Sequence, residues 1–238
     1  MAPTIAVRSK QDNVTPLRNG RRYISVRPVE CPGSGAYRSR RSRRAARSEP
    51  SASAGKRIFD IVGASAALLF FLPLLIAIAI AIKLTSPGPV LFCQSRYGYP
   101  NRFFRIYKFR TMRTDAGDAR GVRQTVRGDA RITPVGKFLR KTSLDELPQL
   151  FNVLVGQMSL VGPRIIHPSE LPRYGEYGQK RLSVKPGITG LWQISGRQHI
   201  SYDERVQLDM QYIDTRKFIV DLIILVKTLK VFIVHTGA

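Results

Sequence analysis

An uncharged apolar run at residues 61–82 constrains this chain more than any other feature of its sequence. The run is rich in Ala, Leu, Ile and Phe. As a straight helix rising about 1.5 Å per residue it would reach roughly 33 Å, enough to cross the hydrocarbon core of a bilayer. A helix buried in a soluble core is rarely apolar on every side over such a length. The run therefore predicts a helix inserted in a membrane.

Two details favour a bent, re-entrant helix over a straight span. Pro73 lies near the middle of the run, where it removes a backbone hydrogen bond and kinks a helix. Lysine and arginine favour the cytoplasmic side of a membrane. They flank the run on both sides, at Lys56, Arg57, Lys83, Arg96, Arg102, Arg105, Lys108 and Arg110. We expect residues 56–84 to enter and leave the membrane by one face, with a full crossing as the alternative.

Residues 1–55 have no apolar periodicity and many Pro, Ser and Gly residues, so we expect a disordered basic tail. The formal net charge of the chain is +23, which indicates an anionic partner: nucleic acid, an acidic membrane surface or a phosphorylated substrate. Cys31 and Cys93 are the only cysteines, which is typical of a reducing compartment.

Residues 85–238 alternate short strands with helices, which predicts a small α/β catalytic domain at the membrane with amphipathic interfacial helices. Residues 90–94 and 103–112 read as strands, and residues 115–129 as a polar loop. Thr133-Pro134 predicts a helix start, with the hydroxyl as N-cap and the proline in the first turn. Residues 217–235 are apolar but interrupted by charges, and fit a core helix and an interfacial helix equally well.

The Asp145-Glu146 pair has two interpretations. Ser143 and Glu146 match a capping box before an apolar run, which would make the acidic residues structural. The pair is also surrounded by cations that are candidate substrate-binding residues, namely Lys108, Arg110, Arg140 and Arg164. Carboxylates beside such cations would repel a nucleic-acid backbone. They suit phosphoryl transfer, in which a carboxylate attacks phosphorus or holds Mg²⁺ while cations neutralise the phosphate oxygens.

Five motifs, in matching order over residues 56–235, closely resemble the bacterial sugar transferases, which are monotopic polyprenyl-phosphate phosphoglycosyl transferases of polysaccharide assembly. The motifs are residues 108–112, 139–150, 152–154, 158–164 and 185–197. The resemblance implies a re-entrant helix that breaks at a Ser-Pro pair, whereas this chain has Leu72-Pro73. Trp192, in the last motif, is either a buried anchor or a substrate contact.

The resemblance also implies residue roles. Asp145 would be the nucleophile, forming a covalent phospho-sugar from a UDP-sugar before transfer to polyprenyl (undecaprenyl) phosphate. Glu146 would be the metal ligand that helps place the Mg²⁺ cofactor. Arg140 and Arg164 would grip phosphate groups, and Lys108 is similar in its basic strand.

We therefore expect an undecaprenyl-phosphate hexose-1-phosphate transferase that initiates exopolysaccharide assembly, with galactose or glucose as the sugar. It would act at the cytoplasmic face of a bacterial inner membrane, against anionic lipid and without nucleic acid. The sequence permits a homo-oligomer. The alternatives are a membrane-tethered nucleic-acid-binding protein, which leaves the acidic pair unexplained, and an inactive scaffold of the same fold.

Overall fold

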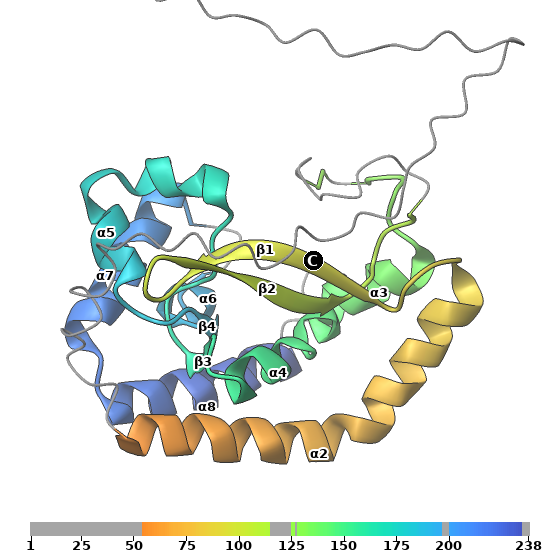
Figure 1. The fold of residues 1–238 in the computed structure, drawn as a ribbon, viewed down its shortest axis with the longest axis horizontal. Helices are drawn as coiled ribbons and strands as arrows, with labels where there is room; N and C mark the ends of the chain where they lie inside the picture. Colours follow the sequence, from red (N-terminus) through yellow and green to blue (C-terminus); the bar gives the residue numbers. More distant parts are fainter. Residues whose placement is uncertain (1–53, 115–124, 127, 197–199, 235–238) are drawn as a thin grey trace, which may run out of the picture. The chain divides into compact units, whose positions relative to one another are not determined.

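The computed structural model describes residues 54–114, 125–126, 128–196 and 200–234 (Figure 1). The predicted tail, except for its last two residues, and most of the predicted loop at residues 115–129 lie outside this part. The elements are α2 (Ala54–Thr85), β1 (Leu91–Gly98), β2 (Arg102–Phe109), α3 (Pro134–Thr142), η1 (Leu144–Glu146), α4 (Gln149–Leu154), β3 (Ser159–Val161), η2 (Pro168–Tyr177), α5 (Gly178–Leu182), β4 (Gly187–Thr189), α6 (Leu191–Ile194), α7 (Tyr202–Thr215) and α8 (Phe218–Val234). The predicted mixture of helices and short strands, with one long apolar helix, is confirmed.

Helix α2 is 32 residues long, contains Pro73 and bends partway along its length (Figure 1). Proline has no N–H to donate and its ring crowds the preceding turn, which accounts for a bend. Within the described residues it is the one helix that is long and apolar enough to cross a membrane, and only 11% of its most apolar window is buried. Ala64 in its first half and Ile78 and Ile82 in its second half are its buried apolar side chains.

The two strand pairs are small. Strands β1 and β2 form an antiparallel hairpin in which Leu91 pairs with Phe109 and Gly98 with Arg102. Strands β3 and β4 form a short parallel pair. A Cβ atom at Gly187 would lie 2.1 Å from the backbone nitrogen of Gly162, so the second pair depends on the absence of a side chain there.

The start of helix α3 follows the prediction. The Thr133 side chain accepts a hydrogen bond from the Gly136 backbone N–H at 2.9 Å, and Pro134 lies in the first turn. Burial of Leu139 against Ile78, Ile82 and Phe109 joins this helix to the second half of α2. Helix α3 therefore packs against α2, the helix that was predicted to insert in the membrane.

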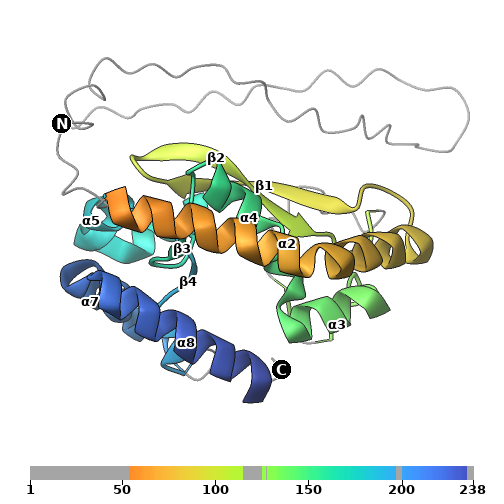
Figure 2. The ribbon, with the colours of Figure 1, turned by 90° about the horizontal axis from the view of Figure 1, so that it is seen from below.

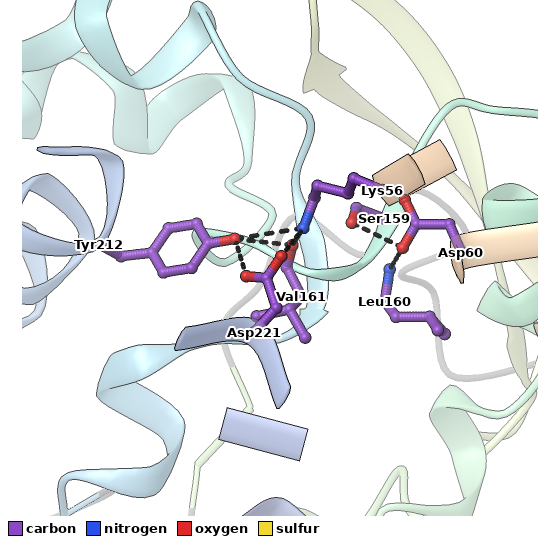
Figure 3. Close-up of polar contacts among 7 residues, drawn as sticks. All are labelled: Lys56, Asp60, Ser159, Leu160, Val161, Tyr212 and Asp221. Carbon is purple, nitrogen blue, oxygen red and sulfur yellow. Dashed lines mark hydrogen bonds and ion pairs between the residues drawn. The ribbon is translucent and has the colours of Figure 1, made fainter. Parts of the chain in front are cut away.

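The first turns of α2 are tied to the rest of the domain by polar contacts (Figure 3). Lys56 forms an ion pair with Asp221 of α8 and lies 3.2 Å from the Val161 carbonyl oxygen of β3. Asp60 is buried, and one of its oxygens accepts hydrogen bonds from the Ser159 hydroxyl and the Leu160 N–H, each at 2.9 Å. The N-terminal end of α2 is therefore built into the domain that carries β3.

Helices α2 and α8 are both in view from below in Figure 2, and both expose apolar side chains. In α8, Ile224 and Asp221 are buried, so one side of the helix packs inward. Val220 and Leu225 are partly buried on the same core. Among the side chains described in this helix, the exposed large apolar ones are Phe218, Ile219, Leu222, Ile223, Val226 and Leu229. Exposed apolar surface on two helices is typical of a membrane-contacting protein.

Candidate active site

The Asp145-Glu146 pair lies in η1, the short turn between α3 and α4. The chain enters this turn through Ser143, whose backbone is left-handed (φ 57°) and whose side chain makes no capping hydrogen bond within the described residues. Helix α4 begins only at Gln149, after Pro148. The capping-box interpretation of Ser143 and Glu146 is therefore wrong. The two carboxylates are left available for other contacts.

Glu146 is held by two cations from distant parts of the chain. The Lys108 ammonium, from β2, donates to Glu146 Oε1 at 2.6 Å. Arg164, which follows β3, has its Nη2 atom 3.9 Å from the same oxygen. The structure thus brings together Lys108, Glu146 and Arg164, three of the residues identified in the sequence as site candidates.

Asp145 is half-buried beside this cluster. Burial raises the pKa of Asp145 to about 6, against the attraction of Lys108 and with a smaller upward contribution from the negative charge of Glu146. At neutral pH the carboxylate is therefore ionised but poorly solvated. A desolvated anion beside cations is well suited to nucleophilic attack on phosphorus.

Arg140 and Arg110 have different surroundings. Arg140, in the last turn of α3, donates to the Thr111 hydroxyl at 2.9 Å and exerts an electrostatic attraction on Asp145. Arg110 is buried and donates to the Ser86 carbonyl and hydroxyl oxygens, both at 2.8 Å. Strand β2 ends at Phe109, whereas residues 103–112 were expected to form one strand, so Arg110 lies beyond the strand. Arg110 instead fixes the chain where it leaves α2.

The family model for bacterial sugar transferases matches residues 51–235. The chain belongs to this family. It is 46% identical over 194 residues to the galactosyl transferase CpsE of Streptococcus agalactiae, which covers 77% of this chain and 43% of that protein. It is 46% identical over 166 residues to the UDP-glucose:undecaprenyl-phosphate glucose-1-phosphate transferase of Escherichia coli, covering 66% of this chain and 36% of that protein.

The exopolysaccharide production protein ExoY of Rhizobium meliloti is closer in length to this sugar transferase. The two are 40% identical over 197 residues, which is 77% of this chain and 87% of ExoY. The match to the Streptococcus and Escherichia proteins, in contrast, spans less than half of either one. The resemblance recognised in the sequence is confirmed as family membership.

Sequence reasoning missed the residues that hold Arg164 of this sugar transferase in place. The Arg164 backbone N–H lies 3.4 Å from Asp209 Oδ1, and its carbonyl oxygen accepts a hydrogen bond from Arg181. The Tyr174 hydroxyl donates to the other oxygen of Asp209 at 2.8 Å. Arg181 and Asp209 are almost completely buried, although in the sequence they look like ordinary surface charges. No local pattern distinguishes them.

From the sequence, Trp192 could be a buried anchor or a substrate contact. In the structure its ring is buried, and two arginines from different parts of the chain contact it. It is 7% exposed, and the Arg164 guanidinium carbon lies 5.2 Å from its ring centroid. The Arg205 guanidinium carbon, from α7, lies 5.0 Å from the same centroid. The ring therefore contacts two guanidinium groups, of which that of Arg164 also approaches Glu146. Arg197, in the same motif, lies outside the described residues.

The acidic pair is compatible with Mg²⁺. Over the residues that the structure describes there is no group of three or more His, Cys, Asp and Glu side chains that would form a complete protein cage. Magnesium needs no such cage, since it is commonly bound by one or two carboxylates together with substrate phosphates and water. The expected ligand, Glu146, is a carboxylate of this kind.

Proposed function

We propose that this sugar transferase moves a hexose-1-phosphate from a UDP-sugar to undecaprenyl phosphate and so initiates the assembly of an exopolysaccharide repeat unit. Galactose and glucose are the sugars we favour, because they appear in the names of the related proteins. The observation that carries the proposal is the half-buried Asp145 carboxylate beside Glu146, which is itself held by Lys108 and Arg164.

In the first step, a carboxylate oxygen of Asp145 attacks the sugar-bearing phosphorus of the UDP-sugar. The bond between this phosphorus and the bridging oxygen breaks, the electron pair stays on that oxygen, and UMP leaves. Asp145 then carries the phospho-sugar as an acyl phosphate. Lys108 and Arg164 neutralise the charge that develops on the phosphate oxygens.

In the second step, a phosphate oxygen of undecaprenyl phosphate attacks the same phosphorus. The bond to Asp145 breaks, the carboxylate is restored, and the lipid leaves with a diphosphate-linked sugar. Glu146 would hold Mg²⁺, which when bound supplies further neutralisation of phosphate charge. Lys108 keeps Glu146 oriented toward this position through its 2.6 Å contact.

The exposed apolar side chains of α2 and α8 support a membrane position for the site. We place the bent α2 as a re-entrant helix at the cytoplasmic face, with α8 in the interface and the basic surface against anionic lipid. A membrane-impermeant thiol reagent applied to intact cells tests this placement, using cysteines engineered at residues 40 and 120. Protection of both sites is expected, and one reactive site with one protected site would indicate a full crossing.

The covalent intermediate is tested without lipid acceptor. Purified enzyme in nanodiscs is incubated with UDP-galactose or UDP-glucose, and adduct mass and UMP release are measured. Asp145→Asn should give neither adduct nor UMP. Asp214→Asn, which changes an exposed aspartate paired with Lys180, is the matched control and should behave like the unmodified enzyme. Full turnover by Asp145→Asn would refute the nucleophile assignment.

A further inference from the structure

A recess lined by two arginines and by the carboxylates Glu170 and Asp209 adjoins the acidic pair on the Arg164 side. Arg164 and Ile166, after β3, Glu170 of η2, Trp192 of α6 and Arg205 of α7 are among the residues that line it. Arg164 also approaches Glu146, so this one guanidinium connects the recess to the proposed reaction centre. The recess therefore lies where a group attached to the reacting phosphate would be placed.

Two of the arginines are held by the same aromatic ring. Trp192 is buried, and the guanidinium carbons of Arg164 and Arg205 lie 5.2 and 5.0 Å from its centroid. A cation–π contact with a buried ring limits the conformations of a guanidinium, while its N–H groups can still donate to oxygen atoms. This arrangement prepares two bidentate donors for an anion.

A third arginine, Arg96 of the hairpin, lies near the recess without lining it. Arg96 lies on β1 next to Tyr97, which forms a bridge with Ile166 of the recess. Its Nη2 donates to Gln94 at 2.5 Å, but within the described residues its buried Nε and Nη1 atoms have no hydrogen-bond partner.

Arg96 interacts electrostatically with Arg164, Glu170 and Glu146, and burial lowers the pKa of its guanidinium. Buried N–H groups left without acceptors are unfavourable, and an anion bound beside Arg96 can supply those acceptors.

We propose that Arg96, Arg164 and Arg205 form a second phosphate subsite, which holds the phosphate of the departing nucleoside monophosphate. This inference rests on the proposed function. The two phosphates of a nucleotide-sugar share one oxygen, so the second must lie beside the first, and Arg164 is placed between them. As the bond to the bridging oxygen breaks, its electron pair stays on this phosphate, and the three guanidinium groups neutralise the added charge.

The position of the recess favours a nucleotide over the lipid acceptor. Segment η2, the teal helical segment above the hairpin in Figure 1, is well separated from α2. The side of the recess formed by Glu170 of η2 therefore lies away from α2, the helix whose apolar side chains are exposed. A lipid phosphate would have to remain close to those side chains, whereas a water-soluble nucleotide would not.

The test measures UMP binding to the full chain in nanodiscs by calorimetry, with uridine as the phosphate-free probe. Arg96→Gln and Arg205→Gln are each expected to raise the dissociation constant of UMP about tenfold, as for a lost charge-assisted hydrogen-bonding pair. Uridine binding should be unchanged. Arg102→Gln removes an exposed charge from the same hairpin and is the matched control, for which UMP affinity should not change.

Steady-state kinetics gives an independent readout. The KM for the UDP-sugar should rise in both variants, while the KM for undecaprenyl phosphate stays constant. Unchanged UMP affinity, or a rise confined to the KM of the lipid acceptor, would overturn the inference. Should a glutamine variant fail to fold, Arg96→Lys or Arg205→Lys replaces it, with weaker UMP binding still expected because lysine cannot bind in bidentate fashion. Failure of the proposed function would look different, since the unmodified enzyme would then release no UMP.

Discussion

The Lys56 ammonium group is ion-paired with the Asp221 carboxylate, 165 residues further along the chain, and this contact joins the first turn of α2 to the first turn of α8. The Tyr212 hydroxyl lies 2.7 Å from the other oxygen of Asp221 and 3.1 Å from the Val161 carbonyl oxygen. The two helices that expose the most apolar surface are therefore linked to each other and to the strand that leads to Arg164.

Replacing Lys56 by methionine should destabilise the protein by about 3 kcal/mol, because the buried Asp221 carboxylate loses its cation. Thermal or denaturant unfolding in detergent measures the change. Lys83→Met, at the exposed C-terminal end of the same helix, should have almost no effect. Equal stability of the two variants would show that the ion pair contributes little.

The rate at which the covalent adduct forms should decrease as the pH falls through about 6. The pKa of Asp145 is raised to about 6 by burial, so below that pH the carboxyl is protonated and cannot attack. Single-turnover measurement of UMP release between pH 5 and 8 checks this, with an expected decrease approaching tenfold per unit at the acidic end. A rate that is independent of pH down to 5 would contradict the expectation.

Asp145→Asn should make the substrate-free enzyme more stable at neutral pH, by about 1–3 kcal/mol. The sign follows from the raised pKa of Asp145, because the folded state then binds the proton more tightly than the unfolded state. The cost of ionising the carboxylate is absent below about pH 4, grows as the pH rises through about 6, and is constant above that. Unfolding at pH 4 and pH 8 should therefore show a stabilisation at pH 8 alone.

The contacts that Asp209 makes with Arg164, Arg181 and Tyr174 predict two variants that lose different amounts of stability. Asp209→Asn removes the negative charge 3.9 Å from the fully buried Arg181 and should cost about 3 kcal/mol of stability. Tyr174→Phe removes one hydroxyl that donates to Asp209 and should cost about 1 kcal/mol. Both variants should raise the KM for the UDP-sugar, because the backbone of Arg164 is then held less firmly by Asp209. If Asp209→Asn and Tyr174→Phe lost the same amount of stability, the charge of Asp209 would be unimportant.

Features set by local sequence were predictable. The N-cap at Thr133, the apolar helix around Pro73 and the hairpin strands follow from hydroxyl capping, hydropathy and β-branched content. The family motifs also led to Lys108, Glu146 and Arg164, which the structure brings together.

Features set by distant contacts were not predictable. Ser143 and Glu146 match a helix cap by spacing, but Glu146 binds Lys108 from a separate strand, and Ser143 turns the chain instead. Arg96 and Arg205 lie far apart in the sequence and each resembles a solvated charge. Only the fold places them around Arg164 and Trp192.

The way α2 is attached has a practical consequence for anyone seeking a water-soluble version of this catalyst. Cutting the chain after the apolar helix would remove the cation facing Asp221 and the carboxylate that receives the Leu160 N–H. It would also remove Arg57, which donates to the Val153 and Leu154 carbonyls, each at 2.6 Å. The truncated protein would lose the internal partners of the strand that leads to Arg164, so solubility is better sought by polar substitutions on the exposed side of the helix than by deletion.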